Sequence, residues 1–485
     1  MTTSPVDPQR ADRRLVAVAV LASFVAFLDG SVVNLALPAI SADFGGGLAL
    51  QQWVVDGYLL TLGALILVAG AVSDQFGRLA VLRVGLLAFG TASVLCAVAT
   101  DGWVLVAARC LQGVGAAFLV PSSLAMINAR FTGARQAQAI GTWTAWTGTA
   151  FVVGPLLGGL LVDAVHWRAI FAVNVIPLAV TLYLTRALPA DPVRRGGRID
   201  VIGAVLGAAG LTGTVFALIE QQRLGPAHPA VFGGLLAGVA CLVAFPFWER
   251  RSAHPMMPLH IFAARNFAVG NLATVFLYAA VSLGPLLVAL FLQETVGMSA
   301  TAAGLATLPI PVLSFLLARR FGTLAGRHGP RLFMAVGPLL GAAGFAWMAT
   351  AGDPFDFWTQ LLPGLVVFGL GLTVTVSPLT AAVLAAVPPA ASGIGSAVNN
   401  AVSRIAGLIA IALTGVIVGT GYNAMDFEGF RRGALVVAGL LVVAGAVSAI
   451  GIRNTVAAYD QTPVQAAAQC HDRAAPPPSH PARRR

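Results

Sequence analysis

The sequence predicts an all-α integral membrane protein with fourteen transmembrane helices. Of its 485 residues, 58% are hydrophobic and 10% are charged, a composition outside the range of soluble globular domains. Apolar runs of about 20 residues, long enough to cross a bilayer as helices, recur along the whole chain. Arginine gathers in alternate connections between these runs, as expected of short cytoplasmic loops.

Clusters of Pro, Gly, Arg and Asp separate the apolar runs and set the span limits. The predicted spans cover residues 15–40, 50–72, 79–99, 103–127, 137–162, 167–187, 199–219, 229–248, 267–293, 299–318, 330–350, 357–385, 393–420 and 432–452. Together with the arginine pattern, this even number of spans predicts that both termini are cytoplasmic.

An internal repeat divides the spans into two six-helix, pseudo-symmetric halves. The segments GAVSDQFGRLAVLRVG (70–85) and GTLAGRHGPRLFMAVG (322–337), both interpreted as loops, share three glycines in one register. Such repeats are typical of secondary transporters. The predicted parts are a cytoplasmic N-terminal tail (1–14), a first bundle (15–187), two inserted helices with flanking loops (188–265), a second bundle (266–454) and a disordered cytoplasmic tail (455–485).

Composition also excludes several classes of chemistry. All 29 basic residues are arginine, so the chain has no Walker A lysine or Schiff-base lysine, and ATP bound by this chain is not its energy source. Its four cysteines and seven histidines show no metal-ligand spacing. We expect no metal, no cofactor and, despite a net charge of +10, no nucleic-acid partner, because the arginines follow membrane topology.

Ionisable residues inside the predicted spans are the candidate functional groups. Asp29 lies in the first span, where an aspartate at the helix centre costs about 2.5–3.5 kcal/mol without a partner or water. Arg109 and Gln112 share one face of the fourth span, and the buried guanidinium needs a partner such as Asp29 or Asp56. Two alternatives stay open: a purely structural ion pair for Arg109, and a water-exposed vestibule position for Asp56.

The segment GAVSDQFGRLAVL resembles the helix 2–3 signature of the major facilitator superfamily, matched by Gly70, Asp74, Gly77 and Arg78. The resemblance implies a cytoplasmic gating loop whose charge contacts break when the two halves rock against each other. An ordinary charged turn that sets topology is the alternative.

Further motifs resemble one branch of this superfamily. VLVAARCLQGVGAA (104–117) resembles its helix 4 motif, and GPLLGGLL (154–161) resembles the helix 5 motif of its antiporters. The matching helix 5 residues are Gly154, Pro155, Gly158 and Gly159. LDGSVVNLALP (28–38), QQWVVDGYLL (51–60), HWRAIFAVNVIP (166–177) and SGIGSAVNNAVSRIAG (392–407) resemble the fourteen-span drug:proton antiporter family 2.

This resemblance implies a proton-coupled exporter of a small amphipathic molecule, driven by the proton motive force, in the plasma membrane of a bacterium. Proton coupling would involve Asp29, Asp56 and Arg109. The candidate cavity residues are Asn34, Gln112, Trp143, Trp146, Asn399 and Arg404, with core packing as the alternative for each tryptophan. We expect a non-enzymatic protein in the lipid bilayer that functions as a monomer. An uptake facilitator on the same fold is the first alternative, and a membrane sensor or enzyme is the remote one.

Overall fold

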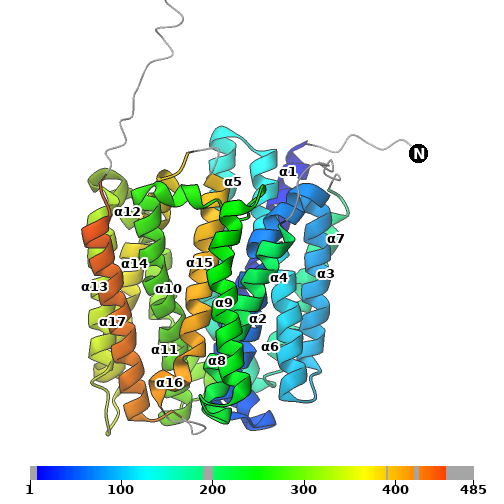
Figure 1. The fold of residues 1–485 in the computed structure, drawn as a ribbon. Coiled ribbons are helices and arrows are strands. Elements are labelled where there is room, and N and C mark those ends of the chain that lie inside the picture. The colour runs from blue at the N-terminus through cyan, green and yellow to red at the C-terminus, as the bar shows by residue number, and fades with distance from the viewer. Residues whose placement is uncertain (1–7, 189–199, 389–391, 420–424, 455–485) are drawn as a thin grey trace, which may run out of the picture. The chain divides into compact units, whose positions relative to one another are not determined.

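The computed structural model describes residues 8–188, 200–388, 392–419 and 425–454, and all regular structure in these ranges is helical (Figure 1). Thirteen of the described helices are long and apolar enough to cross a membrane. The chain is therefore an all-α, multi-pass membrane protein, as the composition predicts. The tails 1–7 and 455–485 lie outside the described residues.

A first group of helices occupies one side of Figure 1 in blue to teal. It comprises α1 (Pro8–Phe44), α2 (Gly47–Phe76), α3 (Arg78–Ala97), α4 (Gly102–Arg130), α5 (Gly133–Ala164), α6 (Ala169–Ala172) and α7 (Val175–Thr185).

The sixth predicted span is not one continuous helix. A break at Val173 and Asn174 separates α6 from α7. Pro177 follows the break and has no N–H to donate to the carbonyl four residues earlier, which weakens a helix at that point. The whole stretch Ala169–Thr185 is shorter than the thirteen spanning candidates. A fourteenth span is therefore not established by length alone.

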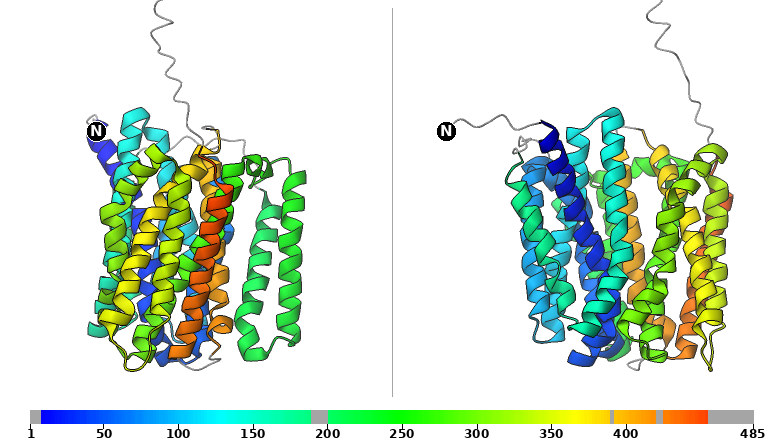
Figure 2. Two further views of the ribbon diagram at one scale, coloured as in Figure 1. Left: turned by 90° about the vertical axis from the view of Figure 1, so that its left-hand side faces the viewer. Right: turned by 180° about the vertical axis from the view of Figure 1, so that it is seen from behind.

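Two inserted helices form a hairpin between the groups in sequence. They are α8 (Val201–Leu224) and α9 (Pro229–Arg251). Helix α8 packs against α2 of the first group and against α15 and α16 of the second, whereas α9 packs against α8 and η1. Figure 2 (left) shows the hairpin standing to one side of the other helices.

The second group follows the hairpin and runs from green to orange in Figure 1. Its elements are η1 (Leu259–Ala263), α10 (Arg265–Leu290), η2 (Phe291–Thr295), α11 (Ala300–Thr307), α12 (Pro309–His328), α13 (Pro330–Met348), η3 (Phe357–Leu361), α14 (Leu362–Ala385), α15 (Ser392–Ala412), α16 (Thr414–Val418) and α17 (Phe427–Gly451).

The repeated segments 70–85 and 322–337 are mostly helical, so their interpretation as whole loops was wrong. Helix α2 continues to Phe76 and α3 begins at Arg78, and only Gly77 separates them. Gly329 separates α12 from α13 in the same way. The two glycines have φ values of 93° and 84°, which favour glycine because it has no Cβ. The shared register thus marks two equivalent helix–helix turns.

The two groups meet mainly at one end of the molecule. We name the end that carries Arg130, Arg251, Arg265 and Arg327 the Arg-rich end, and the opposite end the sealed end. At the sealed end Asp163 of α5 accepts hydrogen bonds from the backbone N–H groups of Ala300 (3.1 Å) and Thr301 (2.7 Å), at the start of α11. Among described residues, every hydrogen bond between the groups lies at this end.

Three consecutive side chains of α2 complete the sealed end. Gln51 donates to Glu294 Oε1 of η2 (2.7 Å), and Gln52 donates to the carbonyl oxygens at the end of α15 (2.7 and 3.0 Å). Trp53 donates to Glu220 Oε1 of α8 (2.9 Å). Helix α2 is thereby bonded to the second group and to the inserted hairpin at once.

Close backbone contact at the sealed end requires a glycine in α5. A Cβ built at Gly159 would lie 2.6 Å from the carbonyl oxygen of Ala300 and 2.6 Å from Cα of Thr301. On the same helix, a Cβ at Gly148 would meet nothing within 4 Å. Gly159 is therefore a packing residue between the groups, and Gly148 is a matched position without that constraint.

We expect Gly159→Val to force α5 and α11 apart at a cost of about 1–3 kcal/mol, the usual penalty for overpacking. A cysteine introduced by Ala303→Cys, in a background without the native cysteines, reports the separation because Ala303 is fully buried on α11. Its labelling by a water-soluble maleimide should rise severalfold with Gly159→Val and stay unchanged with Gly148→Val. Equal labelling in both variants would contradict this assignment.

Candidate functional site

A buried ion pair lies at the centre of the first group. Arg109 Nη1 of α4 is 2.5 Å from Asp29 Oδ2 of α1, and the two side chains are 0% and 2% exposed. Gln112, one helical turn after Arg109, donates to Asp29 Oδ1 at 2.8 Å. The spacing of three residues places both side chains on one helix face, as the sequence predicts, and on this face both reach the same carboxylate. Of the two partners considered for Arg109, Asp29 is the one it contacts.

Asn174 also binds this carboxylate and was missing from the candidate site residues. Its Nδ2 donates to Asp29 Oδ1 at 2.8 Å from the break between α6 and α7. Asp29 therefore accepts three hydrogen bonds, from Arg109, Gln112 and Asn174. A polar residue in an apolar run, three positions before Pro177, was the available signal in the sequence.

The guanidinium of Arg109 is enclosed on its other sides as well. Its Nε donates to the carbonyl oxygen of Val54 (2.9 Å), and Nη1 also contacts Gln112 Oε1 (2.6 Å). The rings of Tyr58 and Phe171 lie 4.5 and 5.6 Å from its Cζ, and Nη2 has no partner. Aromatic faces attract a desolvated cation, so this cage supports the charged form of Arg109.

Asp56 of α2 has the opposite environment. It is 0% exposed, and neither of its carboxylate oxygens has a hydrogen-bond partner. Gln52 and Gly63 share its helical face. Both meet α15: Gln52 through its hydrogen bonds, and Gly63 through a Cβ position 3.7 Å from Cβ of Arg404. Asp56 therefore lies on the face of α2 that packs against the second group.

The predicted gating loop is only partly described. Gly77 is the turn between α2 and α3, and Arg78 begins α3. A Cβ at Gly70 would meet nothing within 4 Å, so close helix packing does not explain that glycine. The side chain of Asp74 lies outside the described residues.

The helix 5 motif packs against two neighbours. A Cβ built at Gly154 would collide with Ser31 of α1 and one at Gly159 with α11, whereas one at Gly158 would make a tight contact of 3.0 Å with Val32 of α1. Pro155 lies inside α5, and its carbonyl oxygen faces Gly304 of α11.

The candidate cavity residues have different environments. Asn34 is half-buried in α1, Trp143 donates to Ser23 Oγ (3.1 Å), and Trp146 is 59% exposed. In the second group, Asn399 donates to Asn271 and Thr274 of α10. Arg404 lies over the Phe27 ring at 5.8 Å and is thus a contact between the groups.

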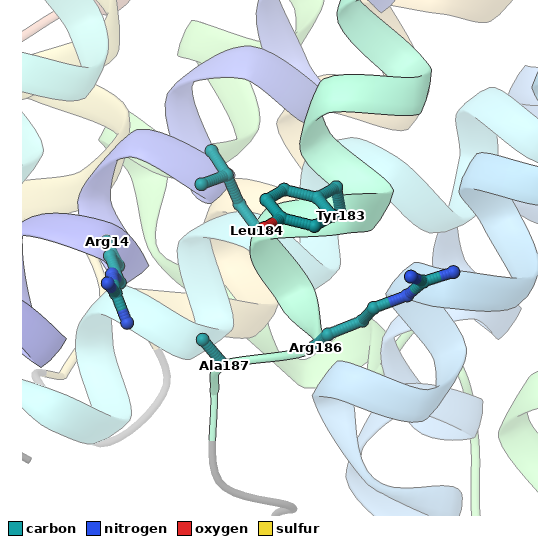
Figure 3. Close-up of a pocket in the computed structure, with 5 residues that line it drawn as sticks. All are labelled: Arg14, Tyr183, Leu184, Arg186 and Ala187. Atoms are coloured by element: carbon teal, nitrogen blue, oxygen red, sulfur yellow. The ribbon is translucent and has the colours of Figure 1, made fainter.

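A surface pocket at the Arg-rich end contains none of these residues. It is lined by Arg14 of α1 and by Tyr183, Leu184, Arg186 and Ala187 at the end of α7 (Figure 3). The sticks in Figure 3 show the Arg14 and Arg186 side chains pointing away from each other. This arrangement does not converge on a ligand, and we assign it no functional role.

Comparison with known proteins identifies the family. Residues 19–411 match the Major Facilitator Superfamily profile. The chain belongs to the major facilitator superfamily. It is 36% identical over 425 residues to a puromycin resistance protein of Streptomyces alboniger, covering 85% of this chain and 82% of that protein. It is 32% identical over 424 residues to a methylenomycin A resistance protein of Bacillus subtilis, covering 86% and 90%.

A third relative is a cephamycin export protein of Amycolatopsis lactamdurans, 32% identical over 420 residues and covering 85% of this chain and 86% of that protein. Among solved structures, a proton-coupled D-xylose symporter matches with a TM-score of 0.65 at 15% identity, covering 91% of this chain and 98% of that chain. A POT family transporter matches with a TM-score of 0.68 at 13% identity, covering 90% and 95%. These two solved structures share the fold of this chain. The family and the named relatives make this chain a transporter of small molecules and not an enzyme.

Removing one member of the buried pair should destabilise the transporter strongly. We expect Arg109→Leu to cost about 3–5 kcal/mol, because it leaves the Asp29 carboxylate buried without its counter-charge. Adding Asp29→Asn should recover part of that loss. Arg431→Leu is the control: its pair with Glu428 is 3.7 Å long and more than half exposed, so the cost should be about 0–1 kcal/mol. Thermal unfolding of the purified variants in detergent measures all three, and equal losses for Arg109→Leu and Arg431→Leu would contradict the interpretation.

Proposed function

We propose that this protein is a proton-coupled exporter of antibiotics or related amphipathic small molecules, working by alternating access. The three relatives described above are named for resistance to, or export of, such compounds. The observation that carries the coupling mechanism is the contrast between two buried carboxylates, one with three donors and one with none.

Asp29 is proposed to stay ionised throughout the cycle. Its oxygens accept one charge-assisted and two amide hydrogen bonds, and each such bond favours the charged form. Arg109 and Asp29 then form a fixed, neutral pair that holds α1, α4 and the α6–α7 break together. In this scheme the pair positions the first group and does not itself exchange a proton.

Asp56 is proposed to carry the proton. A buried carboxylate without a donor is much less costly in its neutral form than in its charged form. Its place between α2 and α15 couples that proton to the conformation. The proton can stay only while the two helices remain packed, and opening the sealed end would admit water to the same carboxylate.

The cycle also requires an orientation in the membrane. We propose that the Arg-rich end is cytoplasmic and that Ala169–Thr185 is the fourteenth span, which places both termini in the cytoplasm of a bacterium. The structure then represents a state closed toward the outside. Substrate would enter from the cytoplasm, and Asp56 would bind its proton from outside when the sealed end opens. The transport path would lie between the two groups of one chain, so a monomer would suffice in the bilayer without a cofactor.

Transport in inverted membrane vesicles tests this function, with puromycin and methylenomycin A as probes. Acidifying the vesicle interior should drive accumulation of at least one probe in wild type, and a protonophore should abolish it. Asp56→Asn should reduce gradient-driven accumulation at least tenfold, about 1.4 kcal/mol, while facilitated exchange of the probe persists. Gradient-independent accumulation, or full coupling in Asp56→Asn, would contradict the mechanism.

The direction of movement in the same vesicles separates the alternative. A proton-linked uptake facilitator would move its substrate together with the proton and would therefore drive it out of vesicles with an acidic interior. An exporter accumulates it inside. Asp163→Asn serves as the control: Asp163 is a carboxylate at the interface that accepts hydrogen bonds from the backbone N–H groups of Ala300 and Thr301, and its loss should leave the coupling ratio unchanged.

A further inference from the structure

Two acidic side chains are buried together at the Arg-rich end of the inserted hairpin. Asp200 precedes α8, and Glu249 lies in the last turn of α9; they are 8% and 3% exposed. Neither belongs to the buried pair or to the α2–α15 interface. The transport mechanism proposed above leaves both unused.

Asp200 is well provided with hydrogen-bond donors. Its Oδ1 accepts from the backbone N–H of Gly203 (2.8 Å) and from Trp248 Nε1 (2.8 Å), and Oδ2 lies 3.1 Å from the same indole nitrogen. Burial alone would raise the pKa of Asp200, but these hydrogen bonds hold the pKa below its usual value. The N-terminus of α8 also favours a negative charge at this position. Asp200 is therefore the ionised member of the pair.

Glu249 is satisfied on one side only. Its Oε2 accepts from the backbone N–H of Met257 (2.9 Å), in the connection that leads to η1 and α10. Its Oε1 is buried and has no hydrogen-bond partner.

The unpartnered oxygen faces the Asp200 carboxylate. A Cβ built at Gly203 would lie 2.8 Å from Glu249 Oε1 and 3.1 Å from Asp200 Oδ2, so these oxygens are less than about 6 Å apart, close enough for two carboxylates to repel strongly. The other charged or titratable side chains near the end of α9, in the connection and in η1 are exposed, namely Arg250, Arg251, His254 and His260, as is Arg265 at the start of α10.

We propose that Glu249 Oε1 is a proton-binding site of the inserted hairpin, separate from Asp56. A second negative charge beside ionised Asp200, on an oxygen without a donor, would be the most costly state of the pair. One proton taken from the water at the Arg-rich end neutralises Glu249 and leaves Asp200 charged. The bound proton keeps the end of α9 docked on α8 and keeps the hydrogen bond to Met257 in place. Loss of the proton loosens the connection between the hairpin and the second group.

Trp248 provides a local reporter, since its indole N–H donates to Asp200. Tryptophan fluorescence of the purified full chain is followed from about pH 4 to about pH 9, a range that covers ordinary and shifted carboxylates. The pH-dependent fluorescence change that Trp248→Phe removes is the signal of Trp248. We expect this Trp248 signal in wild type. We expect Glu249→Gln, which mimics the protonated form, to lose it.

Glu220→Gln is the matched control. Glu220 is a buried glutamate of α8 that also accepts from an indole, but its second oxygen is paired with Arg223 at 2.7 Å. This variant should retain the Trp248-dependent titration. A titration unchanged in Glu249→Gln, or no Trp248-dependent change over the whole range, would overturn the proposal.

Hydrogen–deuterium exchange at Met257 gives a second readout that needs no tryptophan substitution. The intrinsic exchange rate rises with pH and is measured in the unfolded chain. In wild type, exchange at Met257 should rise severalfold more than this intrinsic rate. In Glu249→Gln, it should rise only as much as the intrinsic rate. Identical behaviour of the two proteins would also overturn the proposal. Neither readout involves substrate or a proton gradient, so failure here is distinct from failure of the transport mechanism.

Discussion

The buried pair between Arg109 and Asp29 is the interaction on which the first helix group depends. Either charge alone would be prohibitively costly at a site that is fully enclosed by helices. Together they join α1 to α4, and Gln112 and Asn174 extend the contact to the break before α7. Burying such a pair contributes little net stability compared with apolar packing, but it fixes which helices meet and in which register.

Asp56 and Asp29 differ in their hydrogen-bond environment. Both lie in apolar spans, yet one accepts three hydrogen bonds and the other accepts none. The difference arises because Asp29 lies inside one helix group, whereas Asp56 lies where that group meets α15. In the proposed mechanism Asp56 is buried as a neutral acid, so its protonation and closure of the sealed end favour each other.

The sequence predicted thirteen of the spans, from hydropathy, and the superfamily, from its motifs. It also placed Arg109 and Gln112 on one helix face and gave Asp29 as one of two partners for Arg109, because a buried charge needs a counter-charge. It did not predict the break at Asn174 or the missing partners of Asp56 and Glu249, because these depend on how distant helices pack. The contacts of Glu220 and Glu294 with α2 at the sealed end were likewise not predicted. Helix α2 extends beyond the predicted limit at residue 72 because the polar residues 73–75 do not interrupt its helical backbone.

The protonation state of Asp56 in the closed conformer is the most direct test of this account. Infrared difference spectroscopy of the purified protein near neutral pH detects the carbonyl stretch of a protonated, dehydrated carboxylic acid. In a Glu249→Gln background, which removes the second proposed protonated acid, we expect such a band, its loss on adding Asp56→Asn and its retention on adding Asp29→Asn. A band that disappears with Asp29→Asn and survives Asp56→Asn would contradict the account.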